Sequence, residues 1–172
     1  PFVEQLVRAI GHLHRLGIMH RNINTRDIFV SPTNATIRLG AFELSKYIGT
    51  KGRTRTQCGI PEHLSPERML GQPHGFGCDW WGVGLVLHDM LAGGCTLFRT
   101  SNAETGTTQK QLNLYEQITS CRYFISNSIS PKWADVILRL LTKEECRLGC
   151  VGRTGLSSSS AEILLYIAAN IA

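Results

Sequence analysis

The sequence lacks the cysteine and histidine patterns of a metal-binding or disulfide-rich protein. It has six cysteines, yet no pair shows the C-x-x-C spacing of a zinc site and no histidine cluster accompanies them. It also lacks a segment typical of a secretory leader, and it begins at a proline. We therefore expect reduced, inert thiols, an intracellular and most simply cytoplasmic location, and a chain that is a piece of something longer.

Long apolar runs and long charged runs are absent as well. Residues 161–172 are apolar, but they are about half of the roughly 20 residues needed to span a bilayer, so we expect a packed helix or a frayed end and no membrane anchor. The formal charge is +5, but the basic residues are scattered. This pattern argues against nucleic acid as a partner. An acidic peptide, a phosphate or an anionic partner explains the excess equally well.

The apolar residues that are present predict a single, mostly α-helical domain. A helical period runs from Phe2 to Gly17, and a helix that is apolar on almost every face follows Asp79, its N-cap candidate. Between them, residues 28–30 and 36–39 alternate around a turn and predict a small β-hairpin. Loops are expected over 45–57 and 101–109, shorter helices over 112–118 and 133–141, and a low-complexity linker over 157–160.

Four motifs occur in the order and spacing of one enzyme family. Residues 20–30 resemble the H-R-D-x-K-x-x-N catalytic loop of protein kinases and its following strand, and residues 39–46 lie where a kinase carries D-F-G. Residues 58–67 resemble the G-T-P-E-Y-x-A-P-E end of the activation loop, and residues 78–84 resemble the D-W-W-x-x-G start of the central buried helix. Together the four motifs are highly specific.

Within this family the sequence resembles the AGC group, and most of all the cyclic-AMP-dependent protein kinase catalytic subunits. The D-W-W pair, residues 52–59 and the Arg-Leu-Gly at 147–149 carry this likeness. The resemblance covers residues 2–149. It implies a kinase-like carboxyl-terminal lobe, with the hairpin beside the catalytic loop. We therefore predict a partial kinase domain over 1–150 and an unrecognised tail over 151–172, without the glycine-rich loop or the lysine of an amino-terminal lobe.

The resemblance also implies that the catalytic positions have changed. The aspartate that accepts the substrate hydroxyl proton is Asn22, and an amide has no lone pair basic enough to take that proton. The lysine that steadies the transferred phosphoryl group is Asn24, so a positive charge is missing. The D-F-G aspartate, the main magnesium ligand, is Ala41, whose methyl group cannot bind a hard cation.

Two acidic substitutions favour the opposite conclusion. The second metal position of the loop, usually asparagine, is Asp27, and Glu43 replaces the glycine of D-F-G. These two carboxylates could hold magnesium in an atypical site. The prediction is nevertheless that no cofactor is bound, with ATP and magnesium required only if the protein is active.

The positions that hold a kinase lobe together are kept. By family analogy, Glu67 and Arg147 form a buried ion pair, and Asp79 caps the central helix and holds the backbone of the catalytic loop. Arg21 lies where family members bind a phosphorylated activation-loop threonine, and Thr56 matches that threonine.

The substrate groove is altered in the same comparison. Arg26 replaces a glutamate that reads basic substrates, Asp89 keeps the second acidic group, and Ile60 replaces a threonine that hydrogen-bonds the catalytic pair.

Three functions remain open from the sequence. The leading one is a regulatory or interaction module, a pseudokinase that binds a kinase, a substrate or a regulatory subunit through segments around residues 99–110 and Lys132. The alternative is a Ser/Thr protein kinase that transfers the γ-phosphate of ATP to proteins through the atypical metal site. The third is a truncated product without activity.

Overall fold

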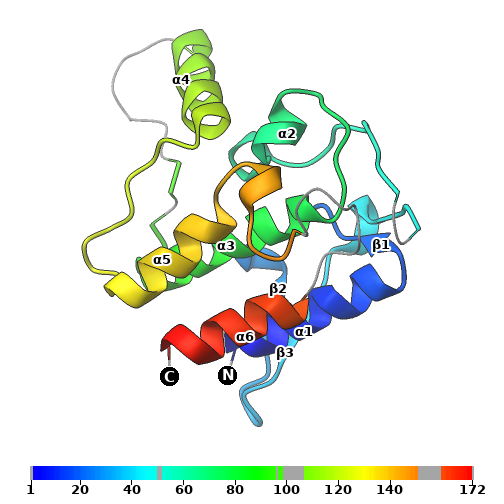
Figure 1. Ribbon diagram of the computed structural model, residues 1–172, viewed down its shortest axis with the longest axis vertical. Coiled ribbons are helices and arrows are strands. Elements are labelled where there is room, and N and C mark those ends of the chain that lie inside the picture. The colour runs from blue at the N-terminus through cyan, green and yellow to red at the C-terminus, as the bar shows by residue number, and fades with distance from the viewer. Residues whose placement is uncertain (1, 50–51, 96, 99–106, 151–159, 172) are drawn as a thin grey trace.

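The central element of the fold is a buried helix, α3 (Gly77–Leu91), which contacts residues 2–15, 25–27 and 131–140 (Figure 1). The computed structural model describes residues 2–49, 52–95, 97–98, 107–150 and 160–171. Trp80 and Trp81 of α3 are fully buried, and α5 (Pro131–Leu140) lies along the helix. The predicted buried helix and the mostly helical fold class are confirmed.

Glycines on α3 let its neighbours approach closely. A Cβ atom at Gly82 would lie 2.8 Å from the Cβ atom of Ile23, and one at Gly84 would lie 2.8 Å from side-chain atoms of Leu141. Distances this short are not tolerated between carbon atoms. The sequence Trp81-Gly82-Val83-Gly84 therefore sets how closely the loop at residue 23 packs on the central helix.

Helix α1 (Phe2–Arg15) ends two residues before Gly17, near which we predicted its end, and the φ of +76° at Gly17 suits the left-handed position after a helix. Strand β2 (Ile28–Val30) pairs antiparallel with β3 (Ile37–Leu39), which confirms the predicted hairpin. A second pair, β1 (Ile18–Met19) with β4 (Lys46–Tyr47), was not predicted. Strand β4 lies in the stretch that we expected to be a loop.

The remaining helices are short or peripheral. Helix α2 (Pro66–Met69) lies beside α4 (Thr107–Ser120), as Figure 1 shows. Four 3₁₀ turns complete the described structure: η1 (Thr25–Asp27), η2 (Phe42–Leu44), η3 (Pro61–His63) and η4 (Glu144–Cys146). Of the predicted loop over 101–109, residues 101–106 fall outside the described residues, and residues 107–109 belong to α4, so the loop prediction is wrong for them. Of the predicted linker over 157–160, the structure describes only Ser160, the first residue of a helix.

The carboxyl-terminal helix α6 (Ser160–Ile171) packs on α1 and α5 (Figure 1), as the packed helix predicted for this stretch. Ile163 is fully buried, and the hydroxyl of Tyr166 donates to the Asp135 carboxylate. The guanidinium of Arg139 lies 4.8 Å from the centre of the Tyr166 ring. Among the described residues, no helix combines the length and apolar character needed to cross a membrane.

Candidate active site

The loop between β1 and β2, which carries the catalytic positions, is fixed to α3 by Asp79. The Asp79 carboxylate accepts hydrogen bonds from the backbone amides of His20 (2.9 Å) and Arg21 (2.8 Å) and lies 2.8 Å from Nε2 of His14. Burial alone would raise the pKa of Asp79, but the His14 contact and the two amides lower it. These bonds also hold Arg21 at φ +70°, a conformation that is costly for a non-glycine residue.

Asp79 does not act as the helix cap that we predicted. Helix α3 begins at Gly77, and its N-cap residue is Phe76, so Asp79 lies within the first turn. Both oxygens of Asp79 are used by His14 and by the loop amides, and the start of α3 has no side-chain cap hydrogen bond. The predicted contact with the loop backbone is confirmed, and the capping role is wrong.

The structure brings three of the predicted site residues into one hydrogen-bonded network. The side-chain amides of Asn22 and Asn24 both donate to Oδ2 of Asp27, at 2.9 and 2.6 Å. Asn24 also donates to the backbone carbonyl of Asn22 and accepts from the amide of Arg26 through Oδ1. The charged groups of this loop therefore differ from the kinase pattern. The carboxylate lies at position 27, and neutral amides lie at positions 22 and 24.

The segment at the D-F-G position lies against the same loop. The amide of Gly40 donates to the carbonyl of Asp27 at 2.9 Å, and Nε2 of His20 lies 2.8 Å from the carbonyl oxygen of Gly40. Ala41 follows in the left-handed region, with φ +57°, and presents only a methyl group. The side chain of Glu43 is exposed on η2.

This donor set fits magnesium poorly. Mg²⁺ requires octahedral oxygen coordination. The loop offers one carboxylate, that of Asp27, and one of its oxygens already accepts from two amides. Ala41 supplies no oxygen. Within the described ranges, no three histidine, cysteine or acidic side chains are grouped so that they could hold a metal ion.

Lys46, which the sequence reasoning passed over, contacts the candidate phosphorylation segment. Its ammonium group donates to the hydroxyls of Thr54 (2.9 Å) and Thr56 (3.1 Å). Thr56 is exposed. The Nε of Arg21, its predicted partner after phosphorylation, donates to the carbonyl of Leu44 at 2.5 Å. The pairing of Arg21 with a modified Thr56 stays a prediction. The sequence carried no sign that Lys46, eight residues before Thr54, lies in a strand, because β4 has only two residues.

The buried ion pair between Glu67 and Arg147 has the bidentate geometry expected of such pairs. The two guanidinium nitrogens Nη1 and Nη2 donate to the two carboxylate oxygens at 2.7 and 3.0 Å. The carbonyls of Gly77 and Thr142 accept the remaining donors of Arg147. Burial alone would raise the pKa of Glu67, but Arg147 lowers it to about 2. The pair ties α2 to the segment after α5.

Two of the predicted groove residues, Asp89 and Ile60, lie on different elements. Asp89 is buried near the end of α3, where desolvation raises its pKa to about 6, and its carboxylate lies 3.8 Å from Nδ1 of His88. Ile60 precedes η3 and is 41% exposed. The resemblance does not require Asp89 and Ile60 to contact each other. Their roles in the substrate groove stay predictions.

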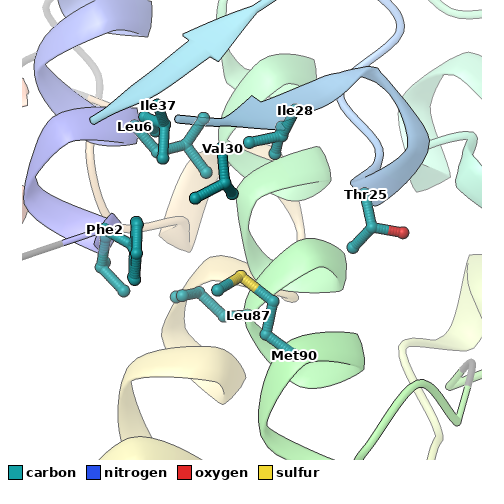
Figure 2. Close-up of a pocket in the computed structure, with 9 residues that line it drawn as sticks. Phe2, Leu6, Thr25, Ile28, Val30, Ile37, Leu87 and Met90 are labelled. Atoms are coloured by element: carbon teal, nitrogen blue, oxygen red, sulfur yellow. The ribbon is translucent and has the colours of Figure 1, made fainter. Parts of the chain in front are cut away.

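An apolar pocket of about 170 Å³ lies beneath the hairpin. Figure 2 shows Phe2 and Leu6 of α1, Val30 of β2, and Leu87 and Met90 of α3 around it. Thr25, which belongs to the catalytic-position loop between β1 and β2, supplies the polar edge of the pocket. The sequence reasoning missed this pocket, although the alternating residues 28, 30 and 37 indicated an apolar inner face of the hairpin.

Comparisons with known proteins agree with this geometry. Residues 1–151 match the protein kinase domain family. The chain is 34% identical over 152 residues, 88% of its length, to Protein kinase 2 of Dictyostelium discoideum. It is 28% identical over 151 residues (87% of the chain) to the atypical protein kinase C of Drosophila melanogaster. The same share of the chain is 26% identical to a cAMP-dependent protein kinase catalytic subunit-like protein of Caenorhabditis briggsae.

These relatives are much longer than the chain. The matched region spans 30%, 25% and 36% of their respective lengths. Two of them, the atypical protein kinase C and the cAMP-dependent catalytic subunit-like protein, carry names of the AGC group that the motifs indicated. The described lobe has the helical architecture and small hairpin implied by the likeness. The chain therefore belongs to the protein kinase domain family, in its AGC-like branch.

Proposed function

We propose that the protein is a regulatory or interaction module, a pseudokinase lobe that binds protein partners without efficient phosphotransfer. The observation that carries the proposal is the network in which Asn22 and Asn24 both donate to Asp27. In this network Asn22, at the position of the catalytic base, donates a hydrogen bond. Asn24, at the position of the lysine that steadies the phosphoryl group, is a neutral amide. One oxygen of the carboxylate that would bind metal already accepts from two protein donors.

The magnitudes support the loss of activity. Phosphoryl transfer depends on positioning and on compensation of charge. Removing one catalytic base or charge costs on the order of 10²–10⁴ in rate. Here the base, the cation and the metal ligand are all changed, at positions 22, 24 and 41. These losses are not additive, but any one of them reduces turnover severely.

The preserved scaffold supports a binding role. Glu67 with Arg147, and Asp79 with the loop amides, keep a kinase-shaped surface without its chemistry. Of the predicted partner segments, 99–106 lies outside the described residues, and Lys132 is exposed at the start of α5. A kinase, a kinase substrate or a regulatory subunit is the class of partner that such a surface would fit.

The alternative is an active Ser/Thr protein kinase with an atypical metal site. It is favoured by the carboxylate of Asp27 at a metal position and by Glu43, which lies on η2 directly after Ala41 and Phe42. It requires that Asp27 exchange its amide donors for a cation. The two functions therefore differ in one measurable property, magnesium-dependent nucleotide binding.

The test uses the full-length protein. We expect no rise in melting temperature with ATP and magnesium, and no transfer of radiolabel to a mixed protein substrate. The variant Asn22→Asp, Asn24→Lys, Ala41→Asp should gain magnesium-dependent ATP binding, because it restores the three missing groups. Wild-type transfer at a rate comparable to that of the restored variant would reject the proposal in favour of the active kinase.

The activation segment offers a site at which the lobe could be regulated by phosphorylation. We propose that another kinase phosphorylates Thr56, since its hydroxyl is exposed and 3.1 Å from the Lys46 ammonium. A phosphoryl group there would gain charge-assisted hydrogen bonds. Phosphopeptide mapping after treatment with an activating kinase should find Thr56 modified and Thr54, which is 8% exposed, unmodified. An unmodified Thr56 would refute this step.

A further inference from the structure

A small polar cavity lies between the catalytic-position loop and the end of the activation segment. Its volume is about 10 Å³, and Arg21, His63 and Arg68 are among the residues that line it. A cavity of this size accommodates about one water-sized sphere. It is separate from the apolar pocket beneath the hairpin, with which it shares no lining residue.

Polar atoms without partners are concentrated around this cavity. Seven buried side-chain polar atoms in the described part of the chain have no hydrogen-bond partner, and three of them belong to residues that line the cavity: Nη1 of Arg21, Nδ1 of His63 and Nε of Arg68. Buried polar atoms are almost always hydrogen-bonded, and each one left unpaired is costly. Three around one cavity indicate a missing ligand. The two guanidinium nitrogens can only donate, so this ligand must accept.

Arg68 adds a buried positive charge that contacts no carboxylate of any described residue. It is 3% exposed, and it donates through Nη1 to the carbonyl of Arg21 at 3.0 Å and through Nη2 to the carbonyl of Cys58. The Cys58 sulfur, 3.4 Å from Nη2, is a further weak acceptor. Over the described ranges, no carboxylate lies within ion-pair distance of Arg21 or Arg68. A buried cation that meets only neutral acceptors is expensive unless an anion accompanies it.

We propose that this cavity binds one small monovalent anion of the size of chloride between the guanidinium groups of Arg21 and Arg68. The volume excludes phosphate or sulfate with their four oxygens. A water molecule would satisfy the donors but not the charge. The bound anion connects the catalytic-position loop to α2, and so holds the end of the activation segment in place while Thr56 carries no phosphate. This site works independently of phosphotransfer, and its test does not depend on the proposed function.

The test compares salts at constant ionic strength on the full-length protein. The melting temperature should rise by several °C, and saturate, when sodium chloride replaces sodium gluconate. The variant Arg68→Met should lose this chloride dependence. Arg8→Met removes an arginine from the exposed face of α1 and should retain the dependence.

A bromide soak of crystals provides the second measurement. An anomalous peak should lie in the cavity between Arg21 and Arg68, and this result decides the matter even if Arg68→Met does not fold. Equal melting temperatures in the two salts, together with an ordered water and no bromide peak in the cavity, would overturn the proposal.

Discussion

Replacing Glu67 by glutamine tests how the lobe is held together. The substitution keeps the shape of the side chain but removes the charge that compensates Arg147, which is 1% exposed. Arg147 would keep its bonds to the carbonyls of Gly77 and Thr142, yet it would lose its counter-charge. Breaking one partner of a buried ion pair typically costs about 3–5 kcal/mol. This is a large part of the roughly 5–15 kcal/mol that stabilises a domain.

The pH dependence of stability gives an independent magnitude for the same pair. The pKa of Glu67 is about 2 in the folded protein, against 4.5 as its ordinary value. The unfolded chain therefore binds a proton more readily, so the stabilisation is complete above pH 4.5 and is lost as the pH falls towards 2. The two pKa values differ by about two and a half, and at about 1.4 kcal/mol for each unit this corresponds to roughly 3.5 kcal/mol.

The assay is urea unfolding of the wild type and Glu67→Gln between pH 7 and pH 3. We expect the variant to lose about 3–5 kcal/mol at pH 7 and to show a smaller loss of stability than the wild type on acidification. The double variant Glu67→Gln, Arg147→Met should recover part of the loss, because no buried charge is left without a partner. A cost below about 1 kcal/mol at pH 7, or an unchanged acid dependence, would refute the reasoning.

Three further predictions concern the packing of the lobe. Asp79→Asn should lower the free energy of unfolding in urea by about 2–4 kcal/mol, because the amides of His20 and Arg21 lose a charged acceptor. Hydrogen exchange at these two amides should become faster. Unchanged exchange would contradict the anchoring role of Asp79. Ile163→Ala should cost about 2–4 kcal/mol, since the side chain is fully buried in α6; a negligible cost would show that α6 is not part of the folded lobe. Burial raises the pKa of Asp89 to about 6, so the folded state binds this proton more tightly and gains stability as the pH falls from about 6 towards 4. Asp89→Asn should abolish that gain, and an identical pH profile in the variant would exclude desolvation of Asp89 as its cause.

The sequence could predict the parts of this fold that rest on motifs and on periodicity. The hairpin, the buried helix and the Glu67–Arg147 pair follow from patterns that are local or shared with a family. The pairing of β1 with β4 could not be predicted in the same way. Each strand has two residues, so neither shows an alternation of apolar and polar side chains.

The candidate site shows a similar division. The exchanged residue types at positions 22, 24 and 27 are visible in the sequence, but their joint hydrogen bonding to Asp27 depends on the turn of η1. Arginine is usually exposed, so nothing in the sequence indicated that Arg68 is buried. The buried position of His14 could have been inferred, because it lies four residues after Ile10 on the apolar face of α1.

The most direct measurement of the central claim is transfer of the γ-phosphoryl group of ATP by the purified full-length protein, compared with its Asp27→Asn variant. The claim is that the kinase scaffold is kept while its chemistry is lost. We therefore expect that neither protein labels a substrate above background. Magnesium-dependent labelling by the wild type that disappears in Asp27→Asn would contradict the claim and establish an active kinase.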